Sequence, residues 1–405
     1  MHNWKEYKLN DLAVVQLSNV DKKTKANEKT VRLCNYTDVY KNAFINNEKA
    51  QNFMVATCND NEFKKFLLKE GQVAITKDSE TTDDIGVPTY IATSFNDVLL
   101  GYHLSLITPN KNKLDGKFLY YYLNTKQSKL YFTNNAGGSG QRCSLSLVCI
   151  KSTPVNIPDL DTQKTISKFL FDLDAKIELN NRINAELEAM AKTIYDYWFV
   201  QFDFPNEKGE PYKSSGGKMV YNNQLKSEIP EGWEVEQISK ILRSEKNTTK
   251  ILASNILDSG LLPVIDQSTE FICGFTDDIS ARIQSDIPRI VFGDHTRILK
   301  LINFDFARGA DGTQILLSNN SRLSQLLFYH QLLDIDLSNY GYARHFKFLK
   351  EHYVLLPIES ISLMYESLSK PMYDMIKQNI FENMKLTQLR DWLLPMLMNG
   401  QVKVK

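Results

Sequence analysis

A stripe of apolar residues across residues 162–200 is the sequence feature that most restricts the fold. Its members recur at alternating spacings of four and three, and only Asn180 and Asn184 interrupt the series. The apolar members are Ile166, Leu170, Leu173, Ile177, Leu187, Ala191, Ile194 and Trp198. A heptad spacing of this kind places one apolar face along a helix, and such a face needs a partner helix.

The partner is predicted within the same chain, because the pattern returns after a shift of 199 residues without gaps. The shift aligns the stripe with Met372, Ile376, Leu386, Leu389, Leu393 and Leu397, and the two asparagines with Asn379 and Asn383. A buried asparagine is costly unless its amide is hydrogen-bonded, so the shared interruption favours two helices that pair with each other. The alternative is a pair of separate amphipathic core helices. We predict an antiparallel coiled coil and an internal pseudo-twofold repeat.

The segments around the helices predict a mixed α+β protein with two similar α/β domains. Strand-like runs separated by polar turns, such as residues 12–17 and 104–108, precede the first helix. Gly232-Trp233-Glu234-Val235 restates Asn3-Trp4-Lys5-Glu6 and opens a second domain that is shorter by roughly thirty residues. The predicted division is 1–158 (first domain), 159–200 (first helix), 201–230 (a linker rich in proline, glycine and serine), 231–358 (second domain) and 359–405 (second helix and tail).

Individual residues predict where the elements begin and end. Asp161 or Thr162 is expected to cap the first helix. Pro371 is expected to kink the second helix or to mark its true start, and Pro395 to break it near its end. Residues 118–131 read as one helix. The glycines of residues 134–141 predict a tight turn and not a phosphate loop, since no Lys-Ser/Thr follows them.

The composition is that of a cytoplasmic protein. The first residues lack the basic segment followed by an apolar one that a signal peptide needs. No stretch approaches the ~20 apolar residues of a membrane span. The cysteines form no CxxC pair. The net charge is zero, but residues 1–155 carry roughly +5 and residues 156–235 roughly −5. This distribution permits nucleic acid at the globular domains and disfavours it along the first helix.

The motifs of three enzyme classes are missing from the sequence. A methyltransferase needs Asn/Asp-Pro-Pro-aromatic and a glycine-rich cofactor loop after a strand, and a motor needs Gly-Lys-Ser/Thr. The nearest nuclease-like string is Asp60, Glu62 and Lys64, which lies in a polar stretch without a strand pattern. We therefore expect no catalytic residues, no metal ligands and no cofactor on this chain.

Two stretches carry a family resemblance. Residues 184–200 read NAELEAMAKTIYDYWFV and continue into QFDFPNEKGEPYKSSGGKMVYN and IPEGWEV, and residues 389–402 read LRDWLLPMLMNGQV. These stretches resemble the two conserved regions of the specificity (S) subunit of type I restriction–modification systems, and the match extends over the whole chain.

The resemblance implies that two variable target-recognition domains each read one half of a split site in double-stranded DNA. The paired helices would fix the gap between the halves and dock two methyltransferase (modification) subunits. Restriction/translocase subunits would join the full complex, and S-adenosylmethionine, ATP and Mg would bind only to partner subunits. A helix of about 38 residues is about 57 Å long at ~1.5 Å per residue, which suits a spacer. The alternative is a coiled-coil adaptor that binds proteins and reads no DNA.

Candidate DNA-binding residues follow from side-chain chemistry. In the second domain, residues 292–300 hold Asp294, His295, Thr296, Arg297 and Lys300. Arginine can hold guanine through two hydrogen bonds, aspartate can accept from cytosine, and lysine or threonine can hold phosphate. The alternative is a salt bridge between Asp294 and Arg297. The turn at residues 308–313 adds further donors, and Arg344 and Lys347 lie near the domain's exit.

The candidates in the first domain lie in two segments, residues 76–81 and 139–144. They are Lys77, Ser79, Gln141 and Arg142. Lys77 and Arg142 are alternatively solvated surface charges, as most such side chains are. Arg142 and Arg344 are the stronger candidates because they occupy matching places in the repeat.

Overall fold

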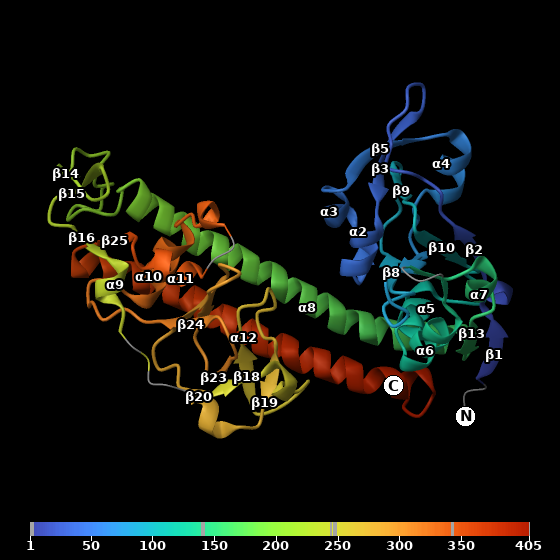
Figure 1. Ribbon diagram of the computed structural model, residues 1–405. Helices are drawn as coiled ribbons and strands as arrows, with labels where there is room; N and C mark the ends of the chain where they lie inside the picture. The colour runs from blue at the N-terminus through green and yellow to red at the C-terminus, as the bar shows by residue number, and fades with distance from the viewer. Residues whose placement is uncertain (1–3, 139–141, 244, 246–248, 342–343, 405) are drawn as a thin grey trace. The chain divides into compact units, whose positions relative to one another are not determined.

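The computed structural model describes residues 4–138, 142–243, 245, 249–341 and 344–404. The chain forms two compact units, Met1–Glu178 with Asn383–Lys405, and Leu179–Glu382. The division falls inside both long helices, so each unit contains one globular domain together with part of each helix. Mixed sheets combined with two long helices confirm the predicted fold class (Figure 1).

The first unit is built around a five-stranded sheet with the order β2–β10–β6–β8–β4. Its strands are Ala13–Leu17, Leu104–Pro109, Val73–Thr76, Pro88–Ile91 and Phe44–Ile45 in that order. A second sheet consists of β5 (Met54–Cys58), β3 (Lys29–Cys34) and β9 (Val98–Leu100). Alternate residues of the five-stranded sheet enter different cores, with Ile75 and Ile107 in one and Ala74 and Leu106 in the other. The sheet is therefore covered on both faces.

Short helices surround these sheets in the first unit. They are α1 (Leu9–Leu12), α2 (Tyr36–Lys41), α3 (Asn47–Ala50), α4 (Asp60–Phe66), α5 (Gly116–Leu123), α6 (Lys126–Asn135) and α7 (Leu147–Lys151). The prediction of one helix over residues 118–131 is wrong. The side chain of Thr125 accepts a hydrogen bond from the Ser128 amide, and this cap starts a second helix.

The second unit contains two further sheets. One has the order β17 (Lys250–Ile251), β23 (Phe306–Gly309), β18 (Leu262–Ile265) and β19 (Gly274–Thr276), with β20 (Arg282–Ile283) also on β23. The other has the order β22 (Leu299–Ile302), β21 (Arg289–Gly293) and β24 (Thr313–Leu316). The helices are α9 (Ile238–Ile241), α10 (Gln325–Leu333) and α11 (His345–Leu349). Phe328 of α10 is buried against Ile290 and Phe292 of β21 in the main core of this unit.

Both globular domains are framed by the same two-stranded clasp. In the first, β1 (Lys5–Lys8) pairs antiparallel with β13 (Pro154–Ile157), and in the second β16 (Glu234–Gln237) pairs antiparallel with β25 (Tyr353–Leu356). Lys5 lies opposite Ile157 and Glu234 lies opposite Leu356, so the register is the same in both copies. A short helix, α1 or α9, follows the first strand of each clasp directly. The predicted internal repeat is thus present at the level of hydrogen bonding.

The long helices are α8 (Leu160–Tyr195), which continues as a π-helical turn over Asp196–Val200, and α12 (Glu359–Met398). The cap of α8 is Asp159 and not Asp161 or Thr162, because its carboxylate accepts from the amide and hydroxyl groups of Thr162. Two predictions for the prolines of α12 are wrong, namely that Pro371 marks the true start of the helix and that Pro395 breaks it. The helix begins twelve residues before Pro371 and continues to Met398, past Pro395.

The helices pair antiparallel within each unit. In the first unit, Ile166 and Leu170 of α8 share a core with Leu397 and, at its edge, Leu393 of α12. In the second, the predicted seam residues that share a core are Leu187, Ala191, Ile194, Trp198, Met372 and Ile376. Leu173, Ile177 and Leu386 are partly buried. Leu389 is 40% exposed, so its prediction as a seam residue is not supported.

The seam asparagines form hydrogen bonds between the helices of the second unit. Asn180 is fully buried and its amide nitrogen lies 2.7 Å from Oε2 of Glu382. Asn379 donates to Asn184. Asn383 is partly buried and belongs to the first unit.

Residues 201–230 are part of the second unit and are more than a linker. They contain the hairpin of β14 (Met219–Asn222) and β15 (Ser227–Pro230). Phe204 stacks on Trp233 at a centroid distance of 5.1 Å, and both are buried with Ile229 in the core. Apolar burial of these residues explains why a segment with turn-like composition is ordered against the domain.

Candidate functional site

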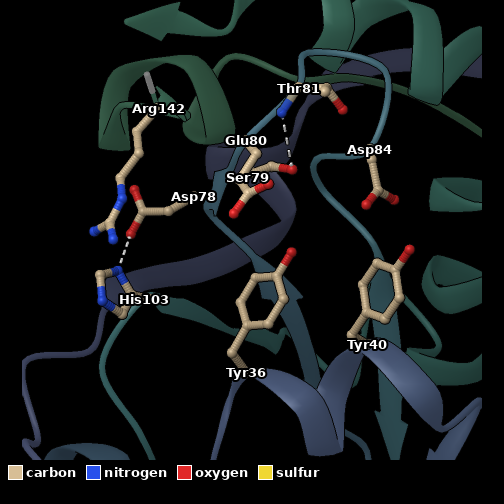
Figure 2. Close-up of a pocket in the computed structure, with 9 residues that line it drawn as sticks. All are labelled: Tyr36, Tyr40, Asp78, Ser79, Glu80, Thr81, Asp84, His103 and Arg142. Carbon is tan, nitrogen blue, oxygen red and sulfur yellow. Dashed lines mark hydrogen bonds and ion pairs between the residues drawn. The ribbon is translucent and has the colours of Figure 1, made fainter. Parts of the chain in front are cut away.

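The candidate segments of the first domain meet in one small sheet. β7 (Asp78–Ser79) pairs with β12 (Cys143–Ser144), which pairs with β11 (Gly137–Gly138). Ser79 lies opposite Cys143, so the two segments singled out from sequence are hydrogen-bonded neighbours. Beside this sheet is a pocket of about 440 Å³. Its lining residues are Tyr36, Tyr40, Asp78, Ser79, Glu80, Thr81, Asp84, His103 and Arg142 (Figure 2).

Asp78 organises the charges on one side of this pocket. Its Oδ2 lies 2.6 Å from Nζ of Lys77 and 2.6 Å from Nδ1 of His103. Burial disfavours the charged carboxylate, but hydrogen bonds from Lys77, His103 and Ser144 outweigh it and lower the pKa of Asp78. The Lys77 ammonium is therefore already neutralised within the domain. The side chain is partly buried, so the alternative of a solvated surface charge is wrong, whereas a contact between Lys77 and DNA stays a prediction.

Arg142 is the unpaired cation of the pocket. Its side chain is exposed and has no hydrogen-bond or ion-pair partner among the described residues. Figure 2 shows its guanidinium on the same side of the pocket as Asp78 and His103. Ser79 also lines the pocket and is partly buried. Gln141, the fourth candidate of this domain, lies outside the described residues.

The other walls of the pocket were missed by sequence reasoning. Tyr36 and Tyr40 of α2 stack with ring centroids 5.8 Å apart, and their hydroxyls point toward the 78–84 segment (Figure 2). Burial, followed by the Asp84 charge, raises the pKa of Tyr36. His103 has a φ of +71°, which is unusual for a residue other than glycine. No local sequence signal links α2, residues 78–84 and His103, because the fold brings them together from separate strands.

The candidate segment of the second domain is the turn between β21 and β22. Asp294 is 5% exposed, and its carboxylate accepts from the amide of Phe346 at the start of α11. Lys300 is 4% exposed, and its ammonium donates to the carbonyl of Asp266. Both side chains are buried and hydrogen-bonded within the domain, and their contacts with DNA stay predictions. The alternative of a salt bridge between Asp294 and Arg297 is wrong, because Asp294 is used at α11.

Gln267 joins this turn to two others. Its Oε1 accepts from the amide of His295, its carbonyl accepts from the hydroxyl of Thr296, and its Nε2 donates to the carbonyl of Asp311. The turns after β18, β21 and β23 are therefore tied together, and we call these residues (266–268, 294–298 and 310–312) the loop cluster. Gly312 is needed here, because a Cβ at that position would lie 2.6 Å from Gln267 Nε2 and the residue has a φ of +73°.

Five candidate residues of the second domain remain exposed, and three of them are cationic. Arg297 has a φ of +64°, and one of its guanidinium nitrogens lies 3.4 Å from the carbonyl of Leu337. A left-handed arginine costs free energy that glycine would avoid, which favours a role for its side chain. Arg344 precedes α11 and Lys347 lies in it, and neither has a side-chain partner among the described residues. His295 and Thr296 are exposed at the loop cluster.

Other kinds of site find no support in the part of the chain that the structure describes. No group of three or more His, Cys, Asp or Glu side chains there is placed to hold a metal ion. No helix among the described residues has the length and apolar character to cross a membrane.

Comparison with known proteins links these two domains to one family. Residues 1–189 match the family model described as the type I restriction modification DNA specificity domain. The MjaIX specificity subunit of Methanocaldococcus jannaschii is 25% identical over 341 residues, which cover 78% of this chain and 76% of that protein. The HindI specificity subunit of Haemophilus influenzae is 30% identical over 207 residues, which cover 50% of this chain and 42% of that protein.

A solved structure shares the fold across both units. It is the type I restriction–modification S subunit from M. genitalium, with a TM-score of 0.59, 16% identity, and coverage of 98% of this chain and 96% of that one. The family model, the curated relatives and the fold agree with the resemblance carried by residues 184–200 and 389–402. Residues 1–189 thus match the DNA specificity domain of type I restriction–modification systems, and most of the chain is similar to specificity subunits of such systems.

Proposed function

We propose that each globular domain reads one half of a bipartite site in double-stranded DNA. The observation that carries this proposal is the repeated clasp, in which β1–β13 and β16–β25 frame two different domains in the same register. Two reading heads of one design suit a split site, because the spacing of half-sites is set by protein geometry. The exposed arginines Arg142, Arg297 and Arg344 supply donors suited to bases or phosphates.

The long helices are proposed to set the gap between the half-sites and to dock two methyltransferase subunits. α8 has 36 residues and α12 has 40, and each contributes to both units. Apolar side chains on α12 remain exposed, including Trp392 at 64%, Leu363 at 55% and Met375 at 49%. A protein partner docked on the helix would bury these side chains, and that burial would contribute to its affinity.

In this proposal the chain contributes recognition and no catalytic group of its own. S-adenosylmethionine, ATP and Mg would be bound by the methyltransferase and restriction/translocase subunits, and the complex would work in the cytoplasm. The contacts of Lys and Arg with phosphates would make the affinity for DNA fall as the salt concentration rises.

The test is to co-purify the chain with its neighbouring methyltransferase and to map methylation of genomic DNA. We expect a split motif of two short half-sites that is lost when the chain is deleted. If no methylation depended on the chain, the protein-binding adaptor would replace this proposal, and the search would turn to proteins bound by the two domains.

A further inference from the structure

Arg308 is the charged residue of the second unit whose surroundings do not explain it. It lies on β23 between Ala307 and Gly309, opposite Ile265 of β18 and Lys250 of β17. The side chain is partly buried, and its Nε is buried without a hydrogen-bond partner. Among the described residues no carboxylate forms an ion pair with it.

Arg308 combines partial burial with the lack of a counter-charge, and three other arginines of this unit are ion-paired. Arg289 pairs with Glu245 at 3.0 Å, Arg322 with Glu234 at 2.9 Å and Arg282 with Asp305 at 3.9 Å. Burial alone lowers the pKa of Arg308, with no nearby carboxylate to raise it. The residues outside the described ranges include no aspartate or glutamate in the sequence. A partly buried cation without a partner is unfavourable in the free protein.

A second unsatisfied group lies close by along the chain. Thr313 is 4% exposed at the start of β24, and its Oγ1 also lacks a hydrogen-bond partner. Residues 310–312, which connect Arg308 and Gly309 to Thr313, belong to the loop cluster tied by Gln267. Two buried polar groups are therefore left without partners at the two strand ends joined by one turn of that cluster. Each such group in a native structure needs an explanation, and for the guanidinium of Arg308 a bound ligand is one.

We propose that Arg308 reads a guanine in the half-site bound by the second domain. Guanine presents O6 and N7 in the geometry of the guanidinium fork, and arginine–guanine is the commonest specific contact to a base. A strand residue with a partly buried stem has the fixed orientation that two parallel hydrogen bonds need. A phosphate contact is less suited to this position, since flexible, fully exposed side chains serve that purpose. This inference rests on the proposed function of the domain.

The experiment is selection of DNA from a random double-stranded library by the full chain in complex with its methyltransferase. The variants are Arg308→Met, which removes the charge, and Arg308→Lys, which keeps it. The second variant serves as a check in case Arg308→Met fails to fold. Arg282→Met is the matched control, because it removes an exposed and paired guanidinium from β20, which pairs with the same strand. Wild type should enrich a bipartite motif, and Arg282→Met should enrich the same motif.

With Arg308→Met, one G·C position of one half-site should lose its preference by about 5- to 150-fold, while the other half-site stays unchanged. Arg308→Lys should lose part of this preference for G·C. The melting temperature of Arg308→Met should equal or exceed that of wild type, because an unpaired charge is removed. An unchanged motif overturns the inference, as does an equal loss of affinity for all sequences, which would indicate a phosphate contact. If wild type enriches no DNA, the proposed function itself fails.

Discussion

Asn379 donates a hydrogen bond from its side-chain amide to the side-chain oxygen of Asn184, across 2.8 Å between α12 and α8. Replacing either one alone with leucine leaves the other amide without its partner at the helix interface. We expect each single variant to lose about 1–3 kcal/mol of unfolding free energy. The double variant Asn184→Leu/Asn379→Leu should regain stability to at least the wild-type level, because two leucines pack at a seam. Chemical denaturation of the four proteins measures this, and additive losses in the double variant would contradict it.

A buried ion pair in the first unit gives a second prediction. Asp174 is 7% exposed, accepts from Arg390 at 2.7 Å, and accepts from the hydroxyl of Tyr121. Asp174→Asn should lower the free energy of unfolding by about 2–3 kcal/mol. This is less than the ~3–5 kcal/mol lost when a fully buried ion pair is broken, because the Arg390 side chain keeps some exposure. The control is Asp172→Asn, two residues earlier, whose pair with Lys168 is exposed and should contribute under about 0.5 kcal/mol. Equal losses in the two variants would show that burial of the pair is unimportant.

His330 makes the stability of the second unit depend on pH. It is 3% exposed on α10 and lies 3.0 Å from the Tyr373 hydroxyl. Burial, followed by the charge of Lys192, lowers the pKa of His330 to about 4, against 6.5 in the unfolded chain. Between these values the unfolded chain binds more protons than the folded one, so stability rises with pH.

The contribution of His330 is complete above pH ~6.5 and is lost as the pH falls toward ~4, with an upper limit of about 3 kcal/mol. His330→Gln should flatten the dependence of stability on pH in this range. His352→Gln, which changes a different histidine, should leave that dependence in place. Thermal melts at half-unit pH steps give the comparison. If the stability of His330→Gln still rose with pH as steeply as that of wild type, another group would cause the pH dependence.

Shortening both helices tests their proposed role as a spacer. Removal of one heptad from facing stretches of α8 and α12, near Asn184 and Asn379, shortens each by about 10 Å at ~1.5 Å per residue. The permitted gap should then fall by about three base pairs at ~3.4 Å each, with the half-site sequences unchanged. Methylation mapping reads both quantities at once. A fixed gap with altered bases would be incompatible with the spacer.

The two arginines at matching places of the repeat should act on different half-sites. Arg142→Gln is expected to weaken recognition of one half-site, and Arg344→Gln of the other, each by about 1–3 kcal/mol if a base is read. Lys347→Gln, close to Arg344 and equally exposed, should lower affinity uniformly if it contacts phosphate. Competition binding with half-site variants separates these effects. Identical consequences of Arg142→Gln and Arg344→Gln would rule out separate reading heads.

The frame of the protein could be predicted from its sequence, whereas much of its reading surface could not. Heptad spacing follows from a local rule of helix packing, so the antiparallel pairing of the two helices and the positions of their asparagines could be predicted. Burial is not a local property. The sequence therefore did not show that Asp294 and Lys300 are buried, because their partners Phe346 and Asp266 lie far away along the chain.

Helix continuation through proline was also misjudged. Pro371 forfeits one backbone hydrogen bond, but Tyr365, Tyr373 and Ile376 on either side of it are buried in the core of the second unit. Their packing outweighs the missing bond and keeps α12 continuous. The pocket residues His103 and Tyr40 gave no signal, because their position depends on which strands become neighbours.

The clasp has a consequence for how such a chain can change over generations. Each domain enters and leaves through two hydrogen-bonded strands, so its entry and exit points are adjacent whatever lies between them. The two domains of this chain already differ by about thirty residues while their clasps keep one register. A domain of this kind behaves as a cassette. A domain of different length fits between the same two strands without a change in the helices that hold it.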